Sequence, residues 1–154
     1  MIDSDVTTAI VDSISIDAPV SKTFAALTDP KQLVQWWGDP SSYQTTHMDC
    51  DLRVGGAWKC IGRNANGETF AVYGHYQVVE PPRLLQFTWT HDWGDGAQPV
   101  ETIVRYELAE REGRTELTVR HWGFTDVEDR DAHERGWKKV LNWLRTYSEA
   151  GPAA

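Results

Sequence analysis

Apolar and polar residues alternate along most of the stretch from Tyr43 to His121, and short turns rich in glycine, asparagine and proline interrupt the alternation. A period of two is typical of strands that bury one face. The turns divide the stretch into six strands spaced roughly 10–15 residues apart, which predicts an antiparallel meander. The chain is therefore restricted to folds in which one sheet supplies most of the core.

The segments on either side of the meander complete the layout. We expect a first strand at 8–17, then two short helices at about 20–27 and 31–36. Apolar residues at helical spacing predict a long amphipathic helix at about 128–149. The fold class is therefore α+β: a strongly curved seven-stranded antiparallel sheet wrapped on a long C-terminal helix, with two short helices between strands 1 and 2.

Length and charge limit the organisation and the partners. The 154 residues are expected to form one domain over 1–154, with an ordered core at about 8–149, a loop at 92–96 and a frayed tail at 151–154. The net charge of −8 argues against nucleic acid or a membrane surface as partner, because both attract basic surfaces. No apolar run approaches the ~20 residues of a membrane span. The acidic N-terminus lacks the pattern of a secretory signal, so we expect a cytoplasmic protein.

Several stretches carry a family likeness. They are Ala18-Pro19, Leu27-Thr28-Asp29-Pro30, Trp36-Trp37-Gly38, Arg53-Val54-Gly55-Gly56-Ala57-Trp58, Gly74-His75-Tyr76-Gln77-Val78-Val79-Glu80-Pro81-Pro82-Arg83-Leu84, Phe87-Thr88-Trp89-Thr90, His121-Trp122-Gly123-Phe124, His133 and Gly136-Trp137. In them the chain resembles the SRPBCC superfamily of START-like or Bet-v-like helix-grip proteins. Within that superfamily it resembles the bacterial single-domain homologues of the activator of heat-shock-protein-90 ATPase. The resemblance implies a helix-grip fold with a deep, mostly apolar cavity.

The space between the curved sheet and the long helix is the natural ligand site of such a fold. We expect inward-facing side chains to line it, namely Trp37, Met48, Cys50, Trp58, Phe70, Tyr76, Phe87, Trp89, Tyr106, His121, Trp137 and Leu141. Aromatic rings offer large apolar areas, which suits a flat ligand. Tyr76, Tyr106 and His121 would be the polar groups that orient this ligand.

Histidines are the candidate chemical groups of the interior. The alternation places His121 on the inner face, where an imidazole could act as a general acid or base. The alternative, which we favour, is a structural histidine with satisfied hydrogen bonds. His91 is also inward but borders a loop, and His47, His75 and His133 are expected at outer or loop positions. No two histidines have the spacing of a helical zinc site, so we expect neither a metal nor a cofactor.

Carboxylates suited to acid–base chemistry are not expected inside. The acidic residues of the strands all fall on the outer face by period, namely Asp49, Asp51, Glu101, Glu107 and Glu116. No serine or cysteine lies in a G-x-S-x-G motif, which argues against a hydrolase of that type.

The two cysteines flank the expected turn at Gly55-Gly56. If Gly55 is the centre of this hairpin, Cys50 and Cys60 face each other on its inner side. A directly opposed pair could approach the distance of a disulfide. We favour two buried, reduced thiols, because the cytosol keeps cysteines reduced.

Three functions remain open. The favoured one is a binding protein for a small apolar or amphipathic molecule, lipid-like or aromatic, with burial of apolar surface supplying most of the affinity. The second is a cyclase- or dehydratase-like enzyme that uses His121 as acid and base, although we consider an enzyme less favoured. The third is a partner-binding module such as a chaperone accessory. The chain is expected to be a monomer or a homodimer.

Overall fold

The computed structural model describes residues 8–92 and 99–150, so most of the expected 92–96 loop and the whole 151–154 tail lie outside the described residues. Ten elements follow one another along the chain: β1 (Ile10–Ile16), α2 (Val20–Thr28), α3 (Pro30–Trp36), β2 (Tyr43–Cys50), β3 (Ala57–Asn64), β4 (Thr69–Glu80), β5 (Leu84–Asp92), β6 (Glu101–Arg111), β7 (Arg114–Trp122) and α4 (Val127–Glu149). This order confirms the predicted α+β layout.

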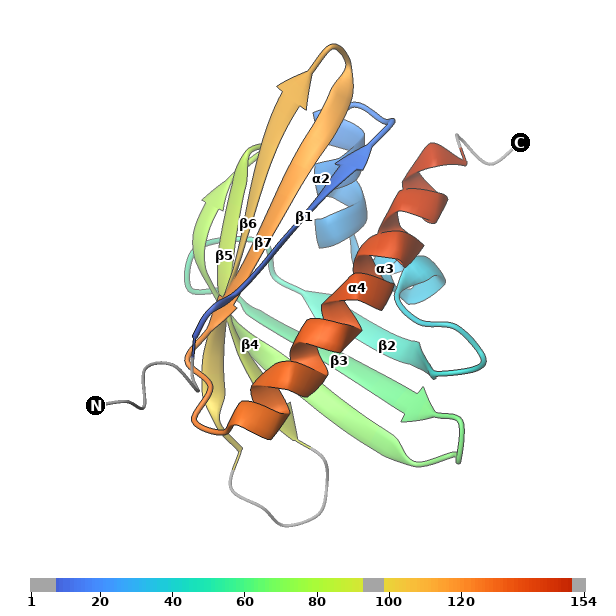
Figure 1. The fold of residues 1–154 in the computed structure, drawn as a ribbon, viewed down its shortest axis with the longest axis vertical. Helices are drawn as coiled ribbons and strands as arrows, with labels where there is room; N and C mark the ends of the chain where they lie inside the picture. Colours follow the sequence, from blue (N-terminus) through green and yellow to red (C-terminus); the bar gives the residue numbers. More distant parts are fainter. Residues whose placement is uncertain (1–7, 93–98, 151–154) are drawn as a thin grey trace.

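The seven strands form one antiparallel sheet in the order β1-β7-β6-β5-β4-β3-β2. Figure 1 shows the strong curvature of this sheet: β1, β5, β6 and β7 run upward, whereas β2, β3 and β4 turn toward the lower right. The long helix α4 crosses the open, concave side, and α2 and α3 lie near its C-terminal half. The sheet therefore wraps around the helix, as the fold class requires.

Local sequence signals set the ends of the helices. Asp29 ends α2 and caps α3, because its carboxylate accepts a hydrogen bond from the backbone N–H of Lys31 at 3.0 Å and Pro30 takes the first helical position. Asp126 caps α4 in the same way through the N–H of Asp129 at 3.3 Å. Within the described residues, no helix is long and apolar enough to cross a membrane.

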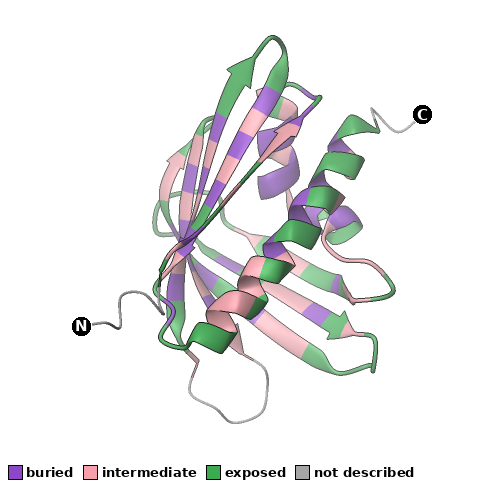
Figure 2. Ribbon diagram, in the orientation of Figure 1, coloured by how far each residue is buried: buried purple, intermediate pink, exposed green. Residues whose placement is uncertain are grey.

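The core lies between the concave face of the sheet and the apolar face of α4. On the sheet side, Val104, Leu117 and Val119 are fully buried. On the helix side, Leu144 is fully buried and Trp137 nearly so, and Figure 2 shows buried positions on α4 and along the strands. The 3.6-residue period of α4 thus places one stripe of its surface against the sheet.

The β2–β3 hairpin has a register that differs from the expected one. Cys50 pairs with Trp58 and Met48 pairs with Cys60, so the two cysteines are diagonal neighbours and not directly opposed. The reason is the connecting loop, which pairs with β4 through a hydrogen bond from the Gly55 N–H to the Tyr76 carbonyl at 2.8 Å. Both thiols are free. The expected face-to-face arrangement of the thiols is therefore wrong.

Candidate functional site

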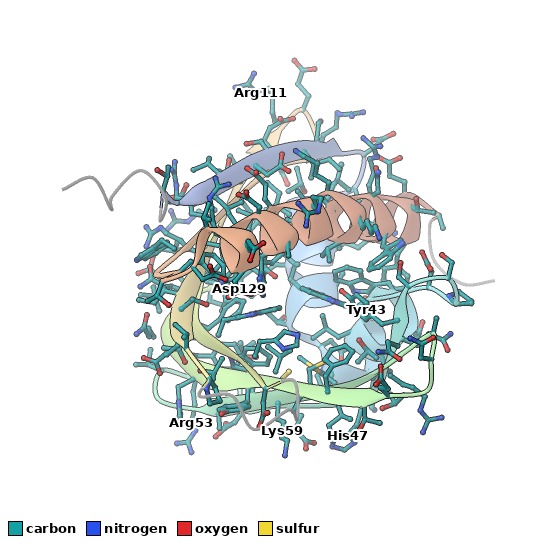
Figure 3. All side chains as sticks on the ribbon, turned by 60° about the horizontal axis from the view of Figure 1, so that its bottom comes forward. Tyr43, His47, Arg53, Lys59, Arg111 and Asp129 are labelled. Carbon is teal, nitrogen blue, oxygen red and sulfur yellow. The ribbon has the colours of Figure 1, made fainter. Side chains whose placement is uncertain are left out.

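A cavity of about 350 Å³ lies between the sheet and α4. Figure 3 shows side chains converging there from both sides, with Tyr43 pointing inward and His47 and Lys59 pointing away from it. Nine of the twelve expected residues line this cavity: Trp37, Met48, Trp58, Phe70, Tyr76, Phe87, Trp89, Tyr106 and Trp137. The structure thus brings most of the expected set together from α4, five strands and the residue that follows α3.

The other three expected residues lie outside the lining. Leu141 follows Val140, which does line the cavity, and the helical turn of about 100° between them directs Leu141 into the packed core. Cys50 is the last residue of β2 and is half-buried, and burial raises the pKa of its thiol. His121 is fully buried behind the cavity wall.

Three indole rings from distant parts of the chain form much of the wall. The ring centroids of Trp37 and Trp137 are 5.8 Å apart, those of Trp89 and Trp137 are 6.0 Å apart, and those of Trp37 and Trp89 are 6.2 Å apart. Trp58 joins this group through Trp89 at 5.7 Å. Tilted and edge-on contacts of this kind stabilise aromatic clusters beyond their burial alone. The wall is therefore a connected set of rings.

Both nitrogens of His121 are already hydrogen-bonded. The indole N–H of Trp137 donates to His121 Nδ1 at 3.0 Å, and His121 Nε2 lies 2.7 Å from the hydroxyl of Thr102. An indole N–H cannot accept, so Nδ1 carries no proton and Nε2–H donates to Thr102, whose own proton goes to the Trp89 carbonyl at 2.9 Å. Burial, with a smaller effect of His133, holds the pKa of His121 well below its usual value. His121 is a positioning residue for Trp137.

Two other histidines line the cavity, and neither is among the twelve expected lining residues, although the alternation predicts an inner position for His91. His91 stacks on Phe70 with centroids 5.3 Å apart, and burial, followed by the nearby His133, lowers the pKa of His91 to about 4. Nδ1 of His133 donates to the Asp129 carbonyl at 2.9 Å. The expected outer position of His133 is wrong. Its spacing of four residues before Trp137 places both on one face of α4, a signal that sequence analysis could have used.

Three tyrosines bring hydroxyl groups to the wall. The hydroxyl of Tyr43 accepts the indole N–H of Trp37 at 3.0 Å, and burial raises the pKa of Tyr43 to about 12. Burial raises the pKa of Tyr76. Tyr106 is 2% exposed, and its hydroxyl forms no side-chain hydrogen bond within residues 8–92 and 99–150. All three hydroxyls remain protonated at neutral pH.

Three residues of the lining are exposed, namely Glu68 and Thr69 of the β3–β4 hairpin and Ala132 of α4, and we define the mouth of the cavity by these three and the half-buried Gly136 of α4. Glu68 accepts a hydrogen bond from the Asn64 side chain at 3.0 Å. Among the described residues, no lysine or arginine lines the cavity, and Glu68 is the one carboxylate of the lining. The described residues contain no cluster of metal-ligating side chains.

The fold and this cavity together define a helix-grip protein of the SRPBCC type. Comparisons with known proteins identify the family within this class. Residues 17–149 match the family model described as "Activator of Hsp90 ATPase homolog 1-like protein", so the chain belongs to that family. A comparison with curated proteins gave no match.

Solved structures agree with this assignment. A protein from Chromobacterium violaceum is 25% identical, with 94% of this chain and 98% of that chain covered and a TM-score of 0.82. The AHSA1 protein from Silicibacter pomeroyi is 28% identical, with 91% of this chain and 96% of that chain covered and a TM-score of 0.78. CalU16 from Micromonospora echinospora is 25% identical, with 90% of this chain and 74% of that chain covered and a TM-score of 0.68.

Proposed function

We propose that the protein binds a small apolar or amphipathic molecule in the cavity between the curved sheet and α4. The observation that supports this most directly is a cavity of about 350 Å³ whose lining includes four tryptophans, three tyrosines and two phenylalanines. A protein interior is normally close-packed, so a space of this size is unusual in a core that has enough large side chains to fill it. Ligand sites are typically concave and apolar in this way.

The energetics favour a ligand of moderate size. Burial of apolar surface contributes about 25 cal/mol per Å², so a two-ring molecule that buries about 300 Å² would gain about 7 kcal/mol. The loss of translational and rotational freedom opposes this gain. We therefore expect dissociation constants in the micromolar to millimolar range for simple aromatic probes, and tighter binding for a ligand that fills the cavity.

The enzyme alternative depended on His121 as acid and base. That residue lies behind the wall, and Trp137 and Thr102 occupy both of its nitrogens. We therefore do not propose a cyclase or dehydratase that uses this group. The partner-binding alternative stays a prediction, since no feature of the described surface selects a partner.

Binding can be tested with a variant that obstructs the mouth. An added Cβ at Gly136 meets no atom within 4 Å, so Gly136→Trp would place a large ring at the opening without disturbing the backbone. Arg135→Trp, at an exposed site on the neighbouring face of α4, is the matched control. Isothermal titration calorimetry with naphthalene derivatives and sterols should show binding to the wild type and Arg135→Trp, and at least tenfold weaker binding to Gly136→Trp.

Native mass spectrometry of the purified protein adds an independent readout, because a resident ligand would increase the mass of the folded species. The proposal loses its support if no probe binds below millimolar concentration and no copurified molecule is present. Equal binding to the wild type and Gly136→Trp would place the ligand outside this cavity.

A further inference from the structure

We propose that the ligand is uncharged and carries a hydrogen-bond-accepting oxygen, a ketone or an alcohol, to which the hydroxyl of Tyr106 donates. This inference rests on the proposed function, because it names the chemical class of the molecule that the same cavity takes. Two independent features of the described residues carry it: a hydroxyl in the wall without a side-chain hydrogen bond, and the absence of cationic side chains from the lining.

Tyr106 lies on β6 with its ring held between two others. Its centroid is 5.4 Å from that of Phe87 and 5.9 Å from that of Trp137, and both contacts are edge-on. The residue lines the cavity and is 2% exposed, yet its hydroxyl has no side-chain hydrogen bond within the described residues. The Tyr106 hydroxyl is not among the buried polar atoms without a partner, so it is a group of the wall that a ligand in the cavity can reach. A phenolic O–H can donate to a ligand oxygen there.

Two neighbouring hydroxyl groups of the wall are already engaged, and the indole N–H of Trp89 is a buried donor without a partner among the described residues. The Tyr43 hydroxyl accepts the Trp37 indole N–H at 3.0 Å, and the Thr45 hydroxyl donates to the Trp37 carbonyl at 2.8 Å. These contacts hold the wall together, and Tyr106 offers its hydroxyl to a ligand.

The charges around the cavity disfavour the binding of an anionic ligand. Within residues 8–92 and 99–150, the lining contains no lysine or arginine, and its one carboxylate, Glu68, lies at the mouth. The whole chain carries a net charge of −8. A carboxylate moved into the cavity would lose its hydration without gaining a cation, and aromatic ring faces are themselves negative. A cation would suit the rings but would leave the Tyr106 donor unpaired.

Three naphthalenes of nearly equal shape separate these possibilities. 2-Acetylnaphthalene carries a ketone, 2-isopropenylnaphthalene replaces the ketone oxygen by a methylene group, and 2-naphthoate is an anion. We expect calorimetry at pH 7 to show that the ketone binds about 5- to 10-fold more tightly than the hydrocarbon, as one hydrogen bond allows. The anion should bind at least about 100-fold more weakly than the ketone.

Tyr106→Phe removes the hydroxyl and keeps the ring. Because that hydroxyl has no side-chain hydrogen bond in the protein, the variant should fold normally, which circular dichroism verifies. The preference for the ketone over the hydrocarbon should disappear, while affinity for the hydrocarbon is kept. The matched control is Tyr73→Phe on β4, where the side chain is 37% exposed and outside the lining, and there the preference should stay.

The outcomes separate the two proposals. If the hydrocarbon binds but the ketone has no advantage, or if Tyr106→Phe keeps the advantage, the role of Tyr106 is overturned while ligand binding stands. Binding of 2-naphthoate as tight as that of the ketone overturns the exclusion of anions. If none of the three compounds binds, both the proposed function and this inference fail.

Discussion

The indole N–H of Trp137 on α4 donates a hydrogen bond to Nδ1 of His121 on β7, with 3.0 Å between the two nitrogens. His121 is fully buried and Trp137 forms part of the cavity wall, so this bond fixes the wall to the sheet behind it. The ring of His121 also contacts Phe124 and Trp89, with centroids 4.5 and 5.5 Å away. The histidine therefore contributes to the shape of the cavity without reaching its contents.

Replacing His121 with alanine should destabilise the fold by about 3 kcal/mol, because it creates a buried void and leaves the Trp137 N–H without an acceptor. Urea denaturation measures this difference. His47→Ala, an exposed histidine on β2, is the control and should change stability by less than about 0.5 kcal/mol. A loss of less than about 1 kcal/mol in His121→Ala would contradict the structural role.

The buried imidazole of His91 makes stability depend on pH. Its folded-state pKa is about 4, mainly because of burial, compared with 6.5 for an ordinary histidine. Above pH 6.5 both the folded and the unfolded chain hold this ring neutral, so it has no effect there. As the pH falls from 6.5 toward 4, the unfolded chain binds the proton first, and stability declines by up to about 3 kcal/mol.

This decline can be assigned to His91 by comparing variants. The free energy of unfolding, measured in urea at pH 7 and pH 5, should fall less in His91→Phe than in the wild type. A phenyl ring can keep the stacking on Phe70. His75→Phe, at an exposed position on β4, should show the full wild-type decline. Identical pH dependence in the wild type and His91→Phe would show that His91 is protonated as easily in the folded state as in the unfolded one.

The two cysteines should behave as free, slowly reacting thiols. Burial raises the pKa of Cys60 to about 11, so the reactive thiolate is scarce at neutral pH. A thiol reagent such as dithionitrobenzoate should modify the folded protein at least tenfold more slowly than the protein in urea, and should count two thiols in urea without reductant. A count of zero would reveal a disulfide that the diagonal register of Cys50 and Cys60 disfavours.

The fold could be predicted because its signals are local and periodic. The alternation between Tyr43 and His121 specifies strands, and the change of period before Trp137 specifies the long helix, within one residue of its observed start. The register of the β2–β3 hairpin could not be predicted in the same way. It depends on the pairing of Gly55 with Tyr76 on β4, a contact between segments that a local pattern does not contain.

For the candidate site, the sequence could predict which side chains point into the interior, but not which of them reach the cavity. Period places His121 inside, but whether it faces the cavity or the sheet depends on Trp137 and Thr102, which lie elsewhere in the chain. His133 was assigned to the surface although its helical phase matches that of Trp137. A strand or helix period distinguishes inside from outside, and it does not distinguish the wall of a cavity from the core behind it.

Gly136 lies at the mouth of the cavity, and the stability of the fold does not require a glycine there. Its φ is not positive and an added Cβ meets no atom within 4 Å, so nothing in the backbone requires glycine at this position of α4. Gly136→Ala should therefore stabilise the fold by about 0.5–1 kcal/mol, because alanine loses less backbone entropy in a helix.

Gly67 is the control, since it is equally uncrowded but has a φ of +85°. Gly67→Ala should destabilise by about 1 kcal/mol, and thermal unfolding of both variants measures the contrast. If Gly136→Ala were destabilised instead, an added methyl group would have to clash at the mouth of the cavity, which contradicts the open space around Gly136.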